Sequence, residues 1–261
     1  MNKTALITGA SSGIGKEFAQ IHASKGGNLV IIARNENKLN ELKQELEENY
    51  KIKVLIITKD LSLPNSAKEI YEKVKAENIK VDFLINNAGF GGVGMFSERD
   101  IEQDVAMVNL NINALISLTH YFLQDFIKNN SGKILNVSST VSLIPAGPMQ
   151  AVYFASKSFV TSFSNAIAEE LSDTNITVTN LMPGATKTAF GESSGMKGTD
   201  IYKNPANAKK VAEQGYNGMI KGELDVIAGV SMKDKISLKL MPILPKKLVL
   251  KQIKKLQQKS E

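Results

Sequence analysis

The chain of 261 residues is 43% hydrophobic and 22% charged, a composition that excludes a disordered or fibrous protein and suits a large α/β domain. It contains no cysteine, which excludes disulfides, thiolate metal sites and a cysteine nucleophile. Its net charge of +6 is concentrated in residues 233–261, where nine lysines and two acidic residues sum to +7, so the near-neutral remainder argues against a nucleic-acid-binding protein.

The amino-terminal residues give an expectation about location. After Met1-Asn2-Lys3 the apolar run is too short for the core of a signal peptide, and the usual cleavage pattern does not follow. No apolar stretch approaches the roughly 20 residues that span a bilayer. The lack of cysteine also suits a reducing compartment. We therefore expect a cytoplasmic protein without a transmembrane segment.

Seven short apolar runs, rich in β-branched residues, recur along the chain. They are nearly continuous rather than alternating, which is typical of strands buried on both faces of a sheet. The predicted strands are residues 5–8, 28–33, 53–58, 81–86, 133–138, 176–182 and 224–228.

Helical patterns separate these runs. The first carries Ile14, Phe18 and Ile21 on one face and ends at Gly26-Gly27. Alternating strands and helices predict right-handed crossovers and a parallel sheet covered on both sides. No linker or repeat marks a second domain. Residues 1–261 are therefore expected to form one doubly wound, Rossmann-type α/β domain of about seven parallel strands.

Two segments depart from the alternation. Residues 189–205, rich in Gly and Ser, are interpreted as a substrate loop, although a plain surface loop fits equally well. Residues 233–261 form a basic C-terminal extension with Val249, Ile253 and Leu256 at helical spacing. This helix is expected to pack on the body or on another subunit. The less favoured alternative is peripheral contact with an acidic membrane surface.

A glycine-rich turn, Thr8 to Gly15, lies where the first strand should become the first helix. Glycines at Gly9, Gly13 and Gly15 allow a tight turn and let the backbone approach a pyrophosphate. The helix that starts there directs its free N–H groups and the positive end of its dipole at the anion. Because the turn has a buried strand before it and an amphipathic helix after it, the pattern predicts a dinucleotide site.

Tyr153 and Lys157 are four residues apart near the start of a predicted helix, so their side chains share one face. A phenol with a pKa near 10 is a poor base at neutral pH. A neighbouring ammonium, and the positive nicotinamide of an oxidised cofactor, would favour the phenolate. The pair is therefore predicted to act in general acid–base catalysis, with Tyr153 giving a proton to a substrate oxygen during reduction.

A hydroxyl group follows the fifth predicted strand. Ser139 is expected to hydrogen-bond the same substrate oxygen and to stabilise the charge that develops on it. If Ser138 or Thr140 faced the site instead, that role would shift by one residue. In isolation, Tyr153 would be interpreted as a half-buried helix tyrosine and Lys157 as a solvated helix lysine.

The corner after the second strand indicates which nicotinamide is preferred. A dinucleotide site that prefers NAD usually has an acidic residue there, whereas this chain has Arg34. The guanidinium is suited to a 2′-phosphate, with Ser12 and Lys38 nearby in the pattern. NADP(H) is therefore the preferred cofactor and NAD(H) the less favoured one. A solvated corner arginine is the alternative.

With these residues in place, the sequence resembles the classical short-chain dehydrogenase/reductase family. The glycine turn has that family's spacing, Thr-Gly-x-x-x-Gly-x-Gly, and further motifs follow in the family's order over roughly residues 4–190. These motifs are Asn86-Asn87-Ala88-Gly89, Asn109, Ser139, Tyr153-x-x-x-Lys157, Pro183-Gly184 and Thr188.

The resemblance implies roles for several positions. Asn109 would hold a water that links Lys157 to solvent, and Thr188 would contact the nicotinamide amide. Asp60 resembles an aspartate that contacts the adenine, with a helix N-cap as its alternative. The implied cofactor-binding residues are Gly9, Ser11, Ser12, Gly13, Ile14, Gly15, Arg34, Lys38, Asp60, Leu61, Asn87, Ala88, Gly89, Tyr153, Lys157, Pro183, Gly184, Thr186 and Thr188. Members of the family often form homodimers or homotetramers, which we also expect here.

Two functions are compatible with these residues. The first is an NADP(H)-dependent enzyme that reduces a small-molecule carbonyl compound, a ketone or aldehyde, to an alcohol, or performs the reverse reaction. The second is a non-catalytic NADP(H)-binding sensor of the same fold. The intact set of Ser139, Tyr153 and Lys157 favours the enzyme.

The remaining aromatic, methionine and histidine residues indicate less about function. Residues that would line an apolar substrate pocket, or else belong to the ordinary core, are Phe190, Met196, Tyr202 and Met241. His22 and His120 have no carboxylate partner nearby in the sequence, so both are interpreted as structural and no metal site is predicted.

Overall fold

The sheet has the predicted architecture in this computed structural model, which describes residues 3–199 and 202–257. The parts of the predicted substrate loop and C-terminal extension at 200–201 and 258–261 lie outside the described residues. Seven parallel strands run in the order β3-β2-β1-β4-β5-β6-β9. They are β1 (Thr4–Thr8), β2 (Asn28–Ala33), β3 (Val54–Thr58), β4 (Phe83–Asn86), β5 (Gly132–Val137), β6 (Ile176–Pro183) and β9 (Asp225–Ala228).

Continuous burial explains why these runs form central strands. All four residues of β4, and all of β1 except Thr4, are buried. Leu6 of β1 lies opposite Val30 of β2 on one side and Leu84 of β4 on the other. The strand order reverses between β1 and β4, the switch point at which open α/β sheets bind ligands at their carboxyl edge.

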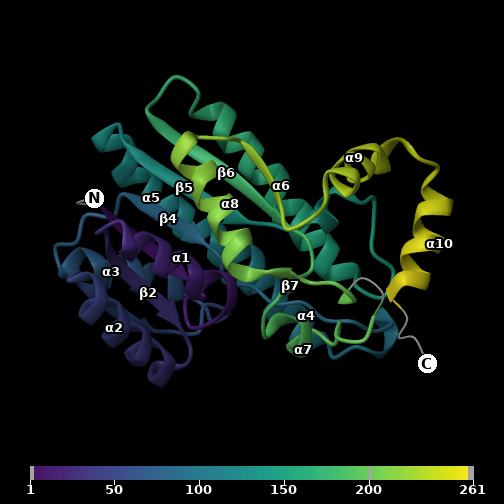
Figure 1. Cartoon of the computed structure of the whole chain (residues 1–261), viewed down its shortest axis with the longest axis horizontal. Helices are drawn as coiled ribbons and strands as arrows, with labels where there is room; N and C mark the ends of the chain where they lie inside the picture. Colours follow the sequence, from purple (N-terminus) through teal and green to yellow (C-terminus); the bar gives the residue numbers. More distant parts are fainter. Residues whose placement is uncertain (1–2, 200–201, 258–261) are drawn as a thin grey trace.

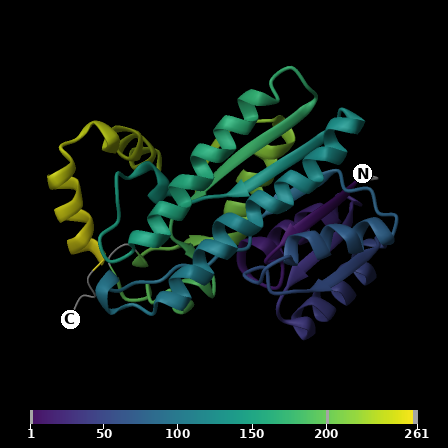
Figure 2. The same cartoon turned by 180° about the vertical axis from the view of Figure 1, so that it is seen from behind.

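Two layers of helices cover the sheet (Figures 1 and 2). One core cluster joins the sheet to α1 (Gly13–Ser24), α2 (Glu36–Tyr50) and α8 (Ala208–Lys221) through residues such as Phe18, Leu42 and Tyr216. The cluster on the opposite face joins it to α3 (Ser66–Ala76), α5 (Leu115–Asn129) and α6 (Ala151–Glu170). The predicted covering of both faces is confirmed.

The helix before β5 contains an irregular turn. α4 (Ile101–Val108) continues through a π-helical segment, η2 (Asn109–Ala114), into α5. A π turn contains one residue more than an α turn and is frequent at functional sites. Here it decides which asparagine faces the sheet edge.

Short elements complete the chain. Two single-turn helices are η1 (Phe96–Glu98) and η3 (Thr140–Leu143). On either side of the predicted substrate loop, residues 189–205, β7 (Thr186–Lys187) pairs with β8 (Ala206–Asn207), and α7 (Phe190–Ser193) lies within the loop. The sequence pattern had not indicated this small second sheet.

The last helices project from the body as an arm (yellow in Figures 1 and 2). The C-terminal arm, residues 231–257, contains α9 (Met232–Leu240), the single turn η5 (Met241–Ile243) and α10 (Lys246–Gln257). As expected, Val249 and Ile253 pack on the body. Among the described residues no helix combines the length and apolar character needed to cross a bilayer.

His22 is fully buried and bridges elements. Its Nε2 lies 3.0 Å from the Lys3 carbonyl oxygen and its Nδ1 2.8 Å from Tyr216 Oη. Because a carbonyl only accepts, Nε2 carries the proton and Nδ1 accepts from the tyrosine. Burial lowers the pKa of His22, which keeps the ring neutral. Its structural role is therefore clear, whereas His120 is an exposed residue of α5.

Candidate active site

The glycine turn between β1 and α1 forms one wall of the site. Gly9 and Gly13 have φ angles of +67° and +55°, a region that side chains disfavour. A Cβ on Gly15 would lie 2.3 Å from the Gly9 carbonyl oxygen, so only glycine fits there. Ser12 is the N-cap residue of α1, but its side chain makes no hydrogen bond to the N–H groups of the first turn. These features fit a pyrophosphate.

Asn87 and Thr8 fasten this turn to the end of β4. Asn87 Nδ2 donates to the carbonyl oxygens of Thr8, at 2.9 Å, and Gly9, at 3.3 Å. Thr8 Oγ1 accepts from the backbone N–H groups of Asn87 and Ala88, each at 2.9 Å. The motif after β4 thus fixes the glycine turn, and Ala88 and Gly89 border the same space.

The corner after β2 carries the predicted phosphate-binding cation. The Arg34 side chain is 76% exposed, and its Nη1 lies 3.8 Å from Asp60 Oδ2. Asp60 Oδ1 accepts from the N–H and hydroxyl of Ser62, so Asp60 lies in a local turn after β3. Burial raises the pKa of Asp60, but these hydrogen bonds and Arg34 outweigh it and leave that pKa below the usual range. Since Asn65 precedes α3, Asp60 is not its N-cap.

The remaining predicted cofactor residues lie around the same edge. Lys38 is exposed in the first turn of α2, whose N-cap is Asn35, and Leu61 is buried beyond β3. After β6, Thr188 reaches the glycine turn, because a Cβ on Gly13 would lie 2.9 Å from Thr188 Cγ2. Thr188, predicted to contact the nicotinamide amide, therefore lies against the glycine turn.

Tyr153 and Lys157 lie on one face of α6, as their spacing predicts, and both are buried. Lys157 Nζ donates to the Val137 carbonyl oxygen at 2.8 Å, which ties α6 to the end of β5. Burial lowers the pKa of Lys157 to about 8. At neutral pH the ammonium form predominates and is held by a backbone dipole.

The pKa of Tyr153 differs from the expectation that Lys157 would lower it. Burial raises this pKa to about 12, and a hydrogen bond with Ser139 lowers it only in part. The reason is desolvation, because a phenolate loses more by leaving water than a neutral phenol does. Tyr153 is therefore a protonated donor at neutral pH, which is the form that reduction requires.

Of the three hydroxyl residues after β5, Ser139 is the one next to Tyr153. Ser138 points instead to α6, where its hydroxyl donates to the Lys157 carbonyl oxygen at 2.8 Å and contacts Thr161. Thr140 begins the η3 turn, for which Ser139 is the N-cap. The structure thus brings together Ser139, Tyr153 and Lys157.

The structure does not bring Asn109 to this group. Asn109 Oδ1 accepts from Asn113 Nδ2 at 2.9 Å on the outer side of η2. Asn111 is buried instead, and a Cβ on Gly89 would lie 3.0 Å from Asn111 Oδ1 and 3.4 Å from Lys157 Nζ. The π turn rotates the helix, so the inward asparagine lies two residues later than expected.

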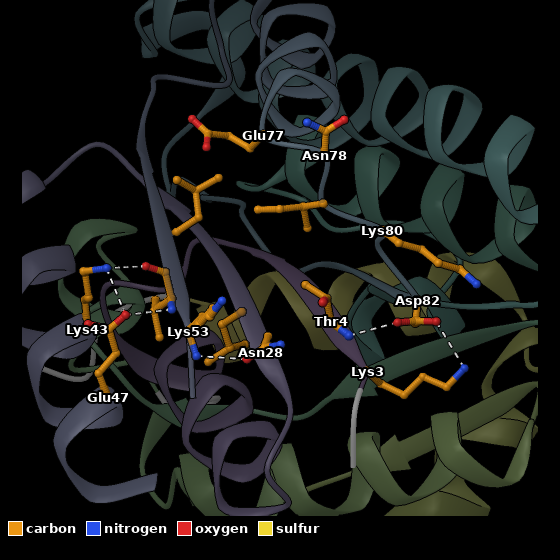
Figure 3. A pocket seen from close by; sticks show the side chains of 14 residues that line it. Lys3, Thr4, Asn28, Lys43, Glu47, Lys53, Glu77, Asn78, Lys80 and Asp82 are labelled. Carbon is orange, nitrogen blue, oxygen red and sulfur yellow. Dashed lines mark hydrogen bonds and ion pairs between the residues drawn. The ribbon is translucent and has the colours of Figure 1, made fainter. Parts of the chain in front are cut away.

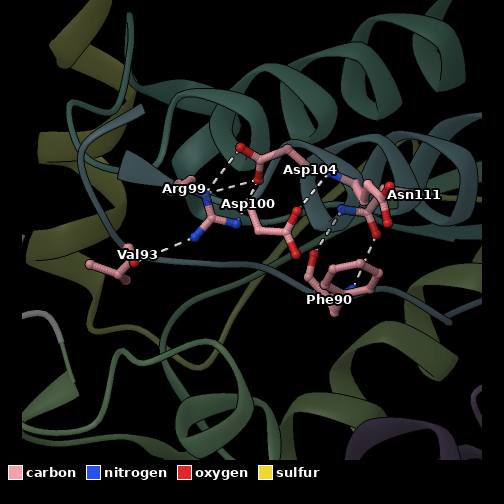
Figure 4. A network of polar contacts seen from close by, with 7 residues as sticks. Phe90, Val93, Arg99, Asp100, Asp104 and Asn111 are labelled. Atoms are coloured by element: carbon pink, nitrogen blue, oxygen red, sulfur yellow. Dashed lines mark hydrogen bonds and ion pairs between the residues drawn. The ribbon is translucent and has the colours of Figure 1, made fainter. Parts of the chain in front are cut away.

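Asn111 and an ion pair hold the two ends of residues 90–99 (Figure 4). Within this segment a Cβ on Gly91 would lie 3.1 Å from Tyr153 Cδ2. The Phe90 N–H donates to Asn111 Oδ1, and Asn111 Nδ2 donates to the Phe90 carbonyl oxygen. At the far end, Arg99 Nε lies 2.9 Å from Asp104 Oδ1, while Arg99 Nη1 donates to the Val93 carbonyl oxygen. The guanidinium and carboxylate are both largely buried.

An apolar cover closes over Tyr153. The Phe190 ring centroid lies 5.6 Å from that of Tyr153. Val249 and Ile253 of α10 belong to the same cluster, together with Met107, Val141 and Phe154. Of the predicted pocket residues, Phe190 and Met241 join this cluster, whereas Tyr202 Oη donates to the Thr186 carbonyl oxygen. The reacting groups thus lie under side chains from distant parts of the chain.

The geometry agrees with the comparison with known proteins. Residues 3–197 match the family model described as short chain dehydrogenase. The chain belongs to the short-chain dehydrogenase/reductase family. It is accordingly an oxidoreductase that acts on CH–OH groups.

Two relatives and one solved structure cover most of this short-chain dehydrogenase. The 7beta-hydroxysteroid dehydrogenase of Mediterraneibacter gnavus is 30% identical, over 86% of this chain and 85% of the relative. The NADP-dependent 3-hydroxy acid dehydrogenase of Schizosaccharomyces pombe is 33% identical, over 87% and 90%. A short-chain dehydrogenase from Sphingobium yanoikuyae, solved in complex with NADPH, has a TM-score of 0.81 at 29% identity and covers 94% and 97%.

A hollow of about 660 Å³ lies elsewhere on this short-chain dehydrogenase, at the amino ends of β1–β3 (Figure 3). Two ion pairs join four of its charged residues. Lys43 Nζ lies 3.0 Å from Glu47 Oε1, and Lys3 Nζ lies 3.1 Å from Asp82 Oδ1. Because Tyr153 and the glycine turn lie at the opposite edge, this hollow is not the active site.

Proposed function

We propose that this short-chain dehydrogenase uses NADP(H) to interconvert a hydrophobic ketone or aldehyde and the corresponding alcohol. The observation that carries the proposal is the burial of Ser139, Tyr153 and Lys157 together beneath an apolar cover. The printed names of two relatives, a hydroxysteroid dehydrogenase and a hydroxy acid dehydrogenase, both describe dehydrogenation of a hydroxyl-bearing substrate.

The side chains divide the work of reduction. When bound, the cofactor supplies a hydride to the carbonyl carbon. Tyr153 donates its phenolic proton to the carbonyl oxygen, and Ser139 hydrogen-bonds that oxygen as negative charge develops on it. Lys157, an ammonium at neutral pH, favours the phenolate that remains. In the oxidation direction the proton returns to Tyr153.

Asn111 is proposed to take the position that the sequence assigned to Asn109. Its side chain lies beside Gly89 and Lys157, where a water bound by the asparagine would connect the ammonium to solvent. Reprotonation of Tyr153 then proceeds through Lys157. Asn109, on the outer side of the helix, is not part of this relay.

Arg34 supports the preference for NADP(H). Its guanidinium is exposed beyond β2, and its Nη1 lies 3.8 Å from Asp60 Oδ2. Asp60 can therefore orient the guanidinium while leaving it accessible to a phosphate. Lys38 adds a second cation in the first turn of α2. The S. pombe relative is named as NADP-dependent, and the S. yanoikuyae enzyme was solved with NADPH.

The decisive experiment follows consumption of NADPH and NADH by the purified protein across a panel of ketones and aldehydes of increasing size. We expect faster turnover with NADPH, a preference for bulky apolar carbonyls, and near-total loss in Tyr153→Phe. Arg34→Ala should reduce kcat/KM for NADPH at least about tenfold and leave NADH almost unaffected, because a phosphate loses a bidentate charge-assisted contact.

Three results would contradict parts of the proposal. Equal use of both nicotinamides by the wild type overturns the role of Arg34. An active Tyr153→Phe variant overturns the proton donor. Tight NADPH binding with no turnover in the whole panel indicates the sensor instead.

A further inference from the structure

The C-terminal arm exposes a run of large apolar side chains. Six occur within the seventeen residues from 232 to 248. Each of these residues is between about half and three quarters exposed. They are Met232 (71%), Ile236 (56%), Leu240 (50%), Ile243 (77%), Leu244 (48%) and Leu248 (65%). Apolar patches of this kind on a soluble domain mark interaction sites.

The exposed apolar residues of α9 form a stripe. Met232, Ile236 and Leu240 are spaced by four residues, so they lie along one side of the helix. No residue of α9 is buried, so its apolar side chains contribute little to the core. The stripe continues through the η5 turn to Ile243 and Leu244.

The same segment is strongly basic. Residues 231–257 contain eight lysines and one acidic residue, Asp234, and therefore carry +7. The carboxylate of Asp234 accepts a hydrogen bond from Ser231 Oγ at 2.7 Å, which fixes it at the start of α9. All of these lysines except Lys235 are in the exposed class. The arm thus combines apolar and cationic groups on its outer surface.

We propose that the C-terminal arm docks on an anionic phospholipid bilayer. The apolar stripe would enter the boundary between headgroups and acyl chains, while the lysines remain at the level of the lipid phosphates. Such a surface supplies both the apolar and the negative partner that the arm requires. A second copy meets these needs less well, because a two-fold contact between two arms would bring two charges of +7 together.

Docking requires no rearrangement of the active-site cover. Val249 and Ile253 of α10 face the cluster around Tyr153, whereas Leu248 and Lys251 on the same helix are exposed. One side of α10 therefore remains packed on the body while the other is available to lipid. Membrane binding is separate from catalysis and goes beyond the proposed function.

The test is co-sedimentation of the full chain with vesicles of phosphatidylcholine containing 30% phosphatidylglycerol, compared with phosphatidylcholine alone. We expect binding to the anionic vesicles that weakens about tenfold or more when the salt concentration is raised from 0.1 to 0.5 M. Ile236→Glu/Leu240→Glu should abolish binding, and Lys246→Glu/Lys247→Glu should weaken it about tenfold or more.

Matched variants on the body separate these effects from general changes. Leu63→Glu replaces an equally exposed apolar residue (56%) outside the arm and should bind as the wild type does, as should Lys128→Glu. Circular dichroism and NADPH binding verify that each variant is folded. Failure to bind anionic vesicles overturns the proposal, as does equal binding to neutral ones. So does conversion of an oligomer to a monomer by Ile236→Glu/Leu240→Glu without any loss of vesicle binding.

Discussion

Asn111 holds both polar groups of the Phe90 backbone, accepting from its N–H at 3.1 Å and donating to its carbonyl oxygen at 3.0 Å. The same side chain lies beside Gly89, in the direction of Lys157. One asparagine thus fixes the segment that enters the active site and borders the buried ammonium. Asn113 and Asn109 instead hydrogen-bond to each other on the outside of the turn.

The Asn111→Leu variant tests this arrangement. We expect kcat to fall at least about tenfold, and the free energy of unfolding to fall by about 1–3 kcal/mol, because the partly buried Phe90 backbone groups lose their partner. Activity assays against pH and denaturant unfolding measure the two effects. Asn109→Leu is the matched control and should be nearly wild type in both. The reverse ranking would return the role to Asn109.

The sheet and the pair Tyr153 and Lys157 could be predicted from the sequence for physical reasons. A strand buried on both faces needs a continuous apolar run, so all seven strands were located to within two residues at each end. Tyr153 and Lys157 share a helix, where a spacing of four places them on one face regardless of the rest of the fold. Ser139 and the glycine turn could also be predicted, because both lie directly after buried strands.

Other parts of the site were missed because long-range packing determines them. The position of Asn111 depends on a π turn that no hydrophobic period reveals. The contact between Arg99 and Val93 joins loop residues with no pattern of their own. The pKa of Tyr153 depends on burial, to which side chains such as Phe190, more than thirty residues away in sequence, contribute.

The buried ion pair of Arg99 and Asp104 provides a second prediction. Only 13% of the arginine side chain and 3% of the aspartate side chain are exposed. Arg99→Ala or Asp104→Ala should each lower the free energy of unfolding by about 3 kcal/mol, since each leaves a buried charge without its partner. Urea unfolding of both single variants and the double variant forms a thermodynamic cycle. The double variant should lose clearly less than the sum; simple additivity would contradict the coupling.

Lys157 should make stability depend on pH. Burial lowers its pKa to about 8, from an ordinary value of 10.5. Between these values the unfolded chain binds more protons than the folded one, so the free energy of unfolding rises as pH rises. This residue should contribute a rise of about 2 kcal/mol between pH 7 and 9.5.

Denaturant unfolding of the wild type and of Lys157→Met over that interval measures the contribution. The variant should be inactive and should lack this part of the rise. Tyr153 does not obscure the result, because its raised pKa affects stability only near and above pH 10. Parallel stability curves for the two proteins would show that Lys157 titrates normally.

The cover formed by α10 predicts an effect on substrate binding. Ile253 is 3% exposed and packs in the cluster around Tyr153. Ile253→Ala should raise KM for bulky apolar carbonyls several-fold with a smaller change in kcat, because apolar contact is lost without moving the reacting groups. Steady-state kinetics over the carbonyl panel measure this split. Gln252→Ala, exposed on the same helix, is the control, and equal effects of the two variants would contradict the proposed contact.

The wide turn at Asn109–Ala114 also sets the phase of the helix that follows it. Each residue added to a helix turns everything beyond it by about 100°. Leu118, Phe122 and Phe126 of α5 point into the core on that phase, just as Asn111 points at Phe90. Deleting a single residue here would therefore rotate the apolar face of α5 away from the core and Asn111 away from Phe90. Apart from Asn111, this segment should accept changes of side chain far more readily than changes of length.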